Sequence, residues 1–161
     1  MASKEETRMD NIEIRSMKIS DLKQVMGIER AVFSHPWPAE AFISDLLSTR
    51  PCHYIVAVEG SKVLGYAGAH LEKEKFHLVN MAVRKSSQRQ GVGSLLMDRM
   101  VGIAGEKDYE VIYLEVRENN QAACVFYRRN GFIEKEIREN YYSDTGEDAI
   151  IMVRRIEDDE K

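Results

Sequence analysis

Features that mark several specialised classes of protein are scarce in this sequence. Its 161 residues include two cysteines, three prolines and one tryptophan. The two cysteines, Cys52 and Cys124, have neither the spacing of a zinc site nor a C-x-x-C redox pattern, so we interpret both as reduced thiols that pack against their neighbours. We therefore expect no metal site.

Long apolar runs and an excess of positive charge are also missing. No apolar run approaches the length that spans a bilayer, and the N-terminus has no apolar core of a signal peptide. A formal net charge of -4 argues against non-specific binding to nucleic acid. We therefore expect a cytoplasmic protein that binds neither membranes nor nucleic acids directly.

The remaining composition is that of a globular domain, with 43% hydrophobic and 31% charged residues. A chain of this length can bury a full hydrophobic core in one domain. Residues 1–10 and 158–161 are polar or charged and have no periodicity, so we predict tails there. Between them, residues 11–157 contain no repeat or linker and are predicted to form a single domain.

Hydrophobic periodicity predicts the order of the secondary-structure elements. One helix begins at Ser20 or Asp21, a second follows Pro38, a third follows Gly91 and a fourth follows Asn120. The second helix is expected to bury a set of apolar side chains, namely Phe42, Ile43, Leu46 and Leu47. The predicted strands are 12–17, 54–58, 63–70, 76–83, 111–117, 133–142 and 149–156.

This order, β-α-α-β-β-β-α-β-α-β-β, indicates the fold class. A helix connects strands 76–83 and 111–117, so these two strands should be parallel with a right-handed crossover. The hairpins on either side of this βαβ unit should be antiparallel. We therefore predict an α/β (α+β) fold in which one mixed, mostly antiparallel sheet has helices on both faces.

The stretch from Phe76 to Leu96 reads as strand, glycine turn and helix. The first N–H groups of a helix have no partner within it and lie at the positive end of its dipole, so they can bind a phosphate. Gly91 and Gly93 would let the backbone approach such an anion, and Arg89 is a nearby cation. The alternative is a plain connection that carries two glycines. Neither a P-loop nor a G-x-G-x-x-G fingerprint is present.

Several stretches together resemble one family. The Q-x-x-G-x-G sequence from Gln88 to Gly93, directly after a strand, is similar to the acetyl-CoA pyrophosphate loop of the GCN5-related N-acetyltransferases (GNAT). Further segments resemble the RimI-type and Ard-type protein N-terminal acetyltransferases within that family: Met81–Val83, Leu114–Arg117, Asn120, Phe126-Tyr127-x-x-x-Gly131-Phe132 and Asn140–Tyr142. The resemblance covers nearly all of residues 12–156 and implies the GNAT fold.

The resemblance also implies where acetyl-CoA binds, namely a cleft where strands 76–83 and 111–117 splay apart. Backbone groups around Met81, Ala82 and Val83 would bind the pantetheine arm and the acetyl carbonyl. Asn120 and Tyr127 would contact the cofactor. The pyrophosphate would be held by the loop residues Gln88, Arg89, Gln90, Gly91, Val92, Gly93 and Ser94.

Glu115 is the first candidate for the general base. It lies within an otherwise apolar strand, where an unpaired carboxylate is costly. A peptide α-amine has a pKa of about 7.7–8.0, against about 10.4 for lysine, so an N-terminus needs only a weak base at neutral pH. The alternative is a structural ion pair between Glu115 and Arg117 or a lysine.

His77 and Tyr127 are the other catalytic candidates. The place of His77 in the central strand resembles that of a histidine in Ard-type enzymes, and it could share the proton path with Glu115; the alternative is a polar side chain without a catalytic role. Tyr127 matches the tyrosine that the family places near the sulfur of CoA; the alternative is an aromatic residue that packs the last helical turn. Neither cysteine falls at a catalytic position, so we predict direct attack in a ternary complex.

Two aromatic segments are expected to bind the substrate N-terminus, as the resemblance implies. One is the loop of Phe33, Ser34, His35, Pro36 and Trp37, and the other contains Tyr141 and Tyr142. Tyrosine offers flat contact area with a polar tip, which suits a peptide backbone. The alternatives are a packing elbow for the loop and ordinary sheet packing for the tyrosines.

Three functions fit these observations. The first is acetylation of protein N-termini, with ribosomal proteins among the possible substrates and the ribosome or an auxiliary subunit as possible partners. The second is acetylation of a lysine or a small amine on the same fold. The third is an acetyl-CoA sensor without turnover, against which the presence of both Glu115 and Tyr127 argues.

Overall fold

The computed structural model describes residues 10–157, and its elements follow the predicted order. The predicted tails, apart from Asp10, lie outside the described residues. The strands are β1 (Glu13–Ser16), β2 (Cys52–Glu59), β3 (Lys62–Leu71), β4 (Phe76–Val83), β5 (Val111–Arg117), β6 (Ile133–Arg138) and β7 (Ala149–Arg155). The helices are α2 (Leu22–Val32), α3 (Ala39–Leu47), α4 (Val92–Glu106) and α5 (Gln121–Arg129), with short 3-10 turns η1 (Ile19–Asp21) and η2 (Lys85–Ser87).

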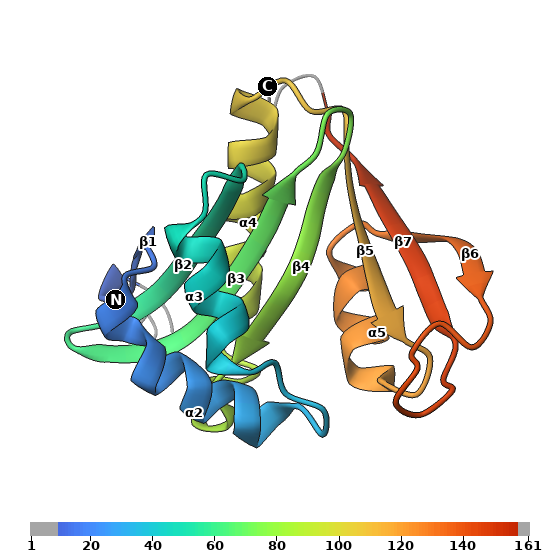
Figure 1. Cartoon of the computed structure of the whole chain (residues 1–161). Helices are drawn as coiled ribbons and strands as arrows, with labels where there is room; N and C mark the ends of the chain where they lie inside the picture. Colours follow the sequence, from blue (N-terminus) through green and yellow to red (C-terminus); the bar gives the residue numbers. More distant parts are fainter. Residues whose placement is uncertain (1–9, 158–161) are drawn as a thin grey trace. The chain divides into compact units, whose positions relative to one another are not determined.

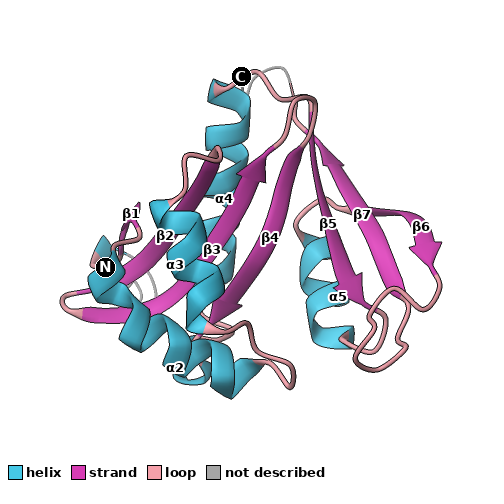
Figure 2. Ribbon diagram, in the orientation of Figure 1, coloured by secondary structure: helices cyan, strands magenta, loops and turns pink. Residues whose placement is uncertain are grey.

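The strands form a seven-stranded sheet in the order β1-β2-β3-β4-β5-β7-β6 (Figure 2). β4 and β5 are parallel, with Phe76 paired to Ile112 and His77 paired to Tyr113. The pairs β1–β2, β2–β3, β5–β7 and β6–β7 are antiparallel. The predicted mixed, mostly antiparallel sheet is thus confirmed, and so is the parallel pair at its centre.

The chain forms two compact units. Of the described residues, 10–71 and 80–100 make up the first unit, and 72–79 and 101–157 make up the second. β4 contributes to both, because its first half belongs to the second unit and its second half to the first. A single domain over residues 11–157 stays a prediction. None of the helices within residues 10–157 is long and apolar enough to cross a membrane.

The first unit has helices on both faces of its strands (Figure 1). On one face, the ring of Phe42 in α3 lies 6.1 Å from that of Tyr54 and 5.9 Å from that of Tyr66. On the other face, a Cβ at Gly65 would lie 3.2 Å from Leu96 in α4 and only 2.9 Å from the carbonyl oxygen of Ala82. Since neighbouring residues of a strand point to opposite faces, Tyr66 and Gly65 define the two sides.

Two local predictions in the first unit need correction. Ile43 and Leu47 are exposed, so the buried side of α3 is centred on Phe42 instead. Asp21 does precede α2, but its side chain does not cap that helix. Its carboxylate instead accepts a hydrogen bond, at 2.8 Å, from the N–H of Lys18, which precedes the η1 turn. The same carboxylate forms an ion pair with Arg15.

The second unit is organised around β5, whose observed bounds match the predicted strand. Alternate residues of β5 are buried, which leaves Tyr113, Glu115 and Arg117 together on the opposite face. α5 begins where predicted, because the side-chain oxygen of Asn120 accepts a hydrogen bond from the Ala123 N–H. The helix ends at Arg129, and Gly131, two residues later, has a φ of 87° that suits a left-handed stop.

Candidate active site

Glu115 and His77 lie in direct contact in the second unit. Their Oε2 and Nε2 atoms are 2.6 Å apart, a distance typical of a charge-assisted hydrogen bond. The strand register explains the contact, because His77 pairs with Tyr113 on the neighbouring strand and stacks on its ring with centroids 4.2 Å apart. The structure therefore brings together two of the three predicted catalytic residues.

A second carboxylate, Glu72, lies at the other ring nitrogen of this histidine. Its Oε1 atom is 3.4 Å from Nδ1 of His77, and both of its oxygens accept from the Tyr113 hydroxyl, at 2.9 and 2.8 Å. Burial and the hydrogen bond to Glu72 raise the pKa of Tyr113, so this phenol stays a donor. Glu72 was missed, because in the sequence it is one of four charged residues in a turn (72–75) and none of the four stands out.

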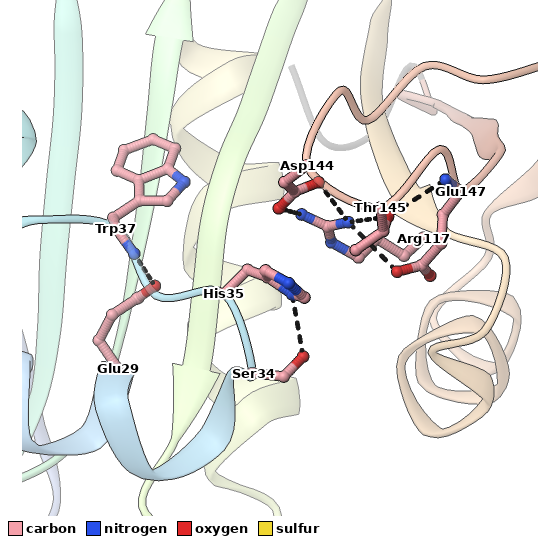
Figure 3. Close-up of polar contacts among 8 residues, drawn as sticks. All are labelled: Glu29, Ser34, His35, Trp37, Arg117, Asp144, Thr145 and Glu147. Carbon is pink, nitrogen blue, oxygen red and sulfur yellow. Dashed lines mark hydrogen bonds and ion pairs between the residues drawn. The ribbon is translucent and has the colours of Figure 1, made fainter.

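Arg117 does not pair with Glu115, which removes one of the structural alternatives. It contacts instead the segment with Tyr141 and Tyr142, where its guanidinium carbon lies 3.9 Å from the centroid of the Tyr142 ring. Its nitrogens contact Asp144 at 3.0 Å, Thr145 at 3.2 Å and Glu147 at 3.4 Å (Figure 3). The arginine thus fixes the loop that carries the two tyrosines.

Both tyrosines lie within the electrostatic influence of Glu115. Burial raises the pKa of Tyr142 to about 12, and the charge of Glu115 adds to the rise while Arg117 opposes it. Burial and Glu115 also raise the pKa of Tyr141. The rings of the two tyrosines meet edge to face at 5.0 Å. The candidate base and this predicted substrate-binding segment both belong to the second unit.

Tyr127, the third catalytic candidate, is half-buried at the end of α5. Its ring contacts Phe126 and Phe132, with centroids 5.5 and 5.7 Å away. Within residues 10–157, its hydroxyl makes no hydrogen bond, and burial raises its pKa. A phenol in this state can donate a hydrogen bond to a developing thiolate more readily than it can give up its proton.

In the first unit, the glycine loop contains two residues in the left-handed backbone region and is braced by two glutamine side chains. Arg89 and Gly91 have positive φ values of 61° and 87°. The side chain of Gln88 donates to the Val83 carbonyl at 2.9 Å and that of Gln90 donates to the Ser86 carbonyl at 3.3 Å, so both brace the loop.

The first turn of α4 leaves backbone donors available. The Leu95 N–H donates to the Gly91 carbonyl, so the N–H groups of Val92, Gly93 and Ser94 precede the helical ladder. The hydroxyl of Ser87 is buried and has no hydrogen-bond partner among the described residues. A dipole end, available amides and an unsatisfied hydroxyl fit an anion such as a pyrophosphate.

The remaining predicted cofactor residues lie at strand and helix ends. Met81 and Ala82 are buried at the end of β4, and Val83 is half-buried. Asn120 uses its side-chain oxygen as the cap of α5, which leaves its amide N–H₂ as the group for a ligand.

The loop with Phe33 and Trp37 connects α2 to α3 in the first unit. Ser34, His35 and Pro36 are exposed, and Ser34 and His35 form a hydrogen bond with each other at 3.2 Å. The Trp37 N–H donates to the carboxylate of Glu29 at 2.9 Å (Figure 3).

Glu29 is a second residue that was missed. A signal for it exists, since it follows Leu22, Val25 and Met26 at spacings of seven, four and three on the apolar stripe of α2. A carboxylate at such a position should be buried and should need hydrogen-bond donors.

Comparison with known proteins identifies the family. Residues 22–132 match the acetyltransferase (GNAT) family. The chain belongs to the GNAT family. The predicted fold and enzyme class, an acetyltransferase, are confirmed by this membership.

Relatives within the GNAT family share about a third of their residues with this chain. The ribosomal protein bS18-alanine N-acetyltransferase of Escherichia coli is 33% identical over 86% of this chain and 94% of its own length. An N-alpha-acetyltransferase of Sulfolobus acidocaldarius is 31% identical over 90% of this chain and 93% of its own length.

Solved GNAT structures agree in fold. The crystal structure of the E. coli ribosomal-protein-S18-alanine N-acetyltransferase superposes with a TM-score of 0.80 at 32% identity, over 90% of this chain and 94% of that chain. Ard1 from Thermoplasma volcanium gives a TM-score of 0.81 at 25% identity, over 91% and 99% of the two chains. The roles of individual residues in this GNAT protein stay predictions.

Proposed function

We propose that this protein transfers the acetyl group of acetyl-CoA to the α-amine of protein N-termini. The observation that carries the proposal is the 2.6 Å contact between Glu115 and His77 in a GNAT fold. A carboxylate beside an imidazole can accept a proton near neutral pH. The similarity to enzymes named for an alanine of a ribosomal protein and for N-alpha-acetylation supports the same acceptor class.

Acetyl-CoA would supply the acetyl group as a thioester with a thiolate leaving group. We assign its pyrophosphate to the loop from Gln88 to Ser94, where the amides at the start of α4 and the Arg89 side chain provide positive potential. The backbone of Met81, Ala82 and Val83 would bind the acyl arm, and the amide of Asn120 would add a contact. No metal takes part in this scheme.

Glu115 acts as the general base in this proposal. A peptide α-amine has a pKa of about 7.7–8.0, so part of it is already neutral at pH 7 and only a modest base is required. As the amine nitrogen attacks the thioester carbonyl, its surplus proton passes to Glu115, directly or through a water molecule. His77 shares that proton through the hydrogen bond to Glu115.

Tyr127 stabilises the leaving group. The carbon–sulfur bond breaks as the amide forms, and negative charge develops on the sulfur. The Tyr127 hydroxyl, which has no other hydrogen bond within the described residues, donates to that sulfur. Direct attack requires no acyl-enzyme, and Cys124 is buried while burial raises its pKa, so it is no nucleophile.

The acceptor peptide would be bound by the Phe33–Trp37 loop and by Tyr141 and Tyr142. The guanidinium of Arg117 stacks on one face of the Tyr142 ring, so the ring offers a fixed surface to a peptide backbone. We propose ribosomal proteins among the substrates, which would place the enzyme in the cytoplasm, with the ribosome itself or an auxiliary subunit as a possible partner.

The test is CoA release from acetyl-CoA with a panel of short peptides that begin with Ala, Ser, Met-Leu or Met-Glu. Each peptide is matched by a version that is blocked at the α-amine but carries an internal lysine. Turnover confined to free N-termini is the expected result. Turnover confined to the blocked peptides would assign lysine acetylation instead, and binding of acetyl-CoA without turnover on any acceptor would contradict an enzymatic role for the isolated chain.

A further inference from the structure

We infer that Glu29 is the positioning residue of the acceptor-binding loop. The inference rests on the proposed role of the loop from Phe33 to Trp37 in binding the acceptor. Glu29 belongs to α2 and is only 1% exposed. Within residues 10–157 its carboxylate has no ion pair with a cationic side chain.

Both ends of the loop are hydrogen-bonded to this one residue. At the start, the Phe33 N–H donates to the backbone carbonyl of Glu29 at 3.0 Å. At the end, the Trp37 N–H donates to Oε2 of its side chain at 2.9 Å (Figure 3). Pro36 and Pro38 have no N–H, so the Trp37 amide is the only backbone donor among these three residues. The carboxylate therefore takes the one backbone hydrogen bond that can fix this part of the loop.

The other carboxylate oxygen ties the loop to the strand that is proposed to bind the acetyl group. Oε1 accepts from the amide of Asn80 at 2.9 Å and from the hydroxyl of Tyr66. Asn80 directly precedes Met81, and Tyr66 lies on β3. Glu29 thus connects α2, β3, β4 and the loop, all within the first unit.

A carboxylate at this position is not needed for packing. An apolar residue of similar size would continue the stripe of α2, but it would leave three buried donors without an acceptor. The three donors have no other acceptor in the contacts described above, so their geometry is set by Glu29. This arrangement suits a residue that fixes the loop relative to Met81.

The test uses Glu29→Gln, which keeps the shape of the side chain but replaces one acceptor oxygen by a donor. In either orientation of the new amide, its N–H₂ group faces another donor, either the Trp37 N–H or the amide of Asn80. We expect KM for the acceptor peptide to rise about tenfold, since a buried hydrogen bond to a charged group is lost. We expect kcat and the Kd of acetyl-CoA to stay within about twofold.

A matched control comes from a half-buried carboxylate in the same unit. Asp45 accepts from Tyr54 at 2.5 Å and from His70 at 2.7 Å, but makes no contact with the loop in these hydrogen bonds. Asp45→Asn should lower stability and leave the acceptor KM within about twofold. The double variant Glu29→Gln/Asn80→Asp exchanges the amide and the carboxylate, and should recover most of the lost acceptor affinity.

Trp37 provides a readout that does not depend on activity, because it is the only tryptophan in the chain. Glu29→Gln should make its fluorescence more accessible to acrylamide, whereas Asp45→Asn should not. If the acceptor proves to be a lysine or a small amine, the same KM comparison is made with that acceptor. The proposed function would then be wrong, while the inference about Glu29 could still hold. Equal changes of KM and quenching in both variants, or no change in either, would overturn the inference.

Discussion

Two glutamates of the same chain, Glu29 and Glu115, are both withdrawn from solvent but differ in their partners. The partners of Glu29 are a backbone N–H, an amide and a phenol, none of which titrates near neutral pH. Burial and the charge of Glu29 raise the pKa of that phenol, Tyr66, further. Glu115 is 15% exposed at its side chain, and its partner is the imidazole of His77, whose ring nitrogens can both donate and accept a proton.

The difference shows how one residue type can serve two purposes. Donors that never titrate hold a carboxylate in place and make it a fixed acceptor, which suits Glu29 as a support for a loop. A titratable partner, here His77, can share the proton that the carboxylate accepts, which suits Glu115 as a base. A second carboxylate, Glu72, extends that path, since it contacts the other ring nitrogen of His77 and is 39% exposed at its side chain.

The largest effect is expected for Glu115→Gln. This change keeps the size of the side chain and removes its ability to accept a proton, so kcat should fall by about 10²–10⁴-fold. The Kd of acetyl-CoA should stay within about twofold, because the proposed pyrophosphate loop belongs to the first unit. Steady-state kinetics and calorimetric titration with acetyl-CoA measure the two quantities.

The contrast with Glu29→Gln makes this prediction sharper. If the two glutamates differ as described, one variant loses kcat and the other loses acceptor affinity. A loss of acceptor affinity without a loss of kcat in Glu115→Gln would remove Glu115 from the proton path and make the two glutamates equivalent.

The sequence was sufficient to name Glu115 and His77 as candidates, but not to show that the two are in contact or that Glu72 lies at the other ring nitrogen of His77. An ionisable residue within a strand of apolar neighbours is conspicuous, and the bounds of that strand were predicted correctly because its alternation is regular. The contact with His77 depends on the register between β4 and β5, which no local pattern encodes. Glu72 is one of four residues of alternating charge in a turn, and only its tertiary contact with Tyr113 distinguishes it.

The errors in the first unit have a similar origin. Ile43 and Leu47 were assigned to the buried side of α3 from hydrophobicity alone. The helix has only nine residues, and it packs against the sheet through Phe42 while Ile43 and Leu47 are exposed to solvent. Glu29 was overlooked because the same reasoning looks for apolar residues on the stripe of α2. The hydrophobic pattern predicted where the helices and strands lie. It did not predict the hydrogen-bond partners of polar residues, such as Glu29, that lie within the pattern.

A smaller effect is expected for Asp45, which has both kinds of partner, a tyrosine and a histidine. Burial opposes its ionisation, but the hydrogen bonds from His70 and Tyr54 outweigh burial and hold the pKa of Asp45 below its usual value. A lowered pKa in the folded state stabilises the protein above the unfolded value of about 3.9, and this stabilisation is lost as the pH falls through the folded value.

Asp45→Asn should therefore lower the free energy of unfolding by about 1 kcal/mol at neutral pH, and the difference from the wild type should shrink in acid. Urea unfolding across the acidic range measures it, with Asp98→Asn at an exposed position of α4 as the control. If the difference in the free energy of unfolding were independent of pH, Asp45 would stabilise the fold by packing and not as an anion.

The smallest effect is expected for Glu72→Gln, which tests whether the path beyond Glu115 matters. Removing the anion 3.4 Å from Nδ1 of His77 weakens the contact that holds the imidazole against Glu115, so kcat should fall. The amide can still accept from the Tyr113 hydroxyl, so the stacked ring should keep its place. At neutral pH the change in kcat should be only about threefold, since Glu72 is partly exposed and its field is screened. Glu74→Gln makes the same change of charge at an exposed position of the same turn and should leave kcat unchanged. An equal fall of kcat in both variants would reduce Glu72 to its contribution to net charge, and the proton path would then end at His77.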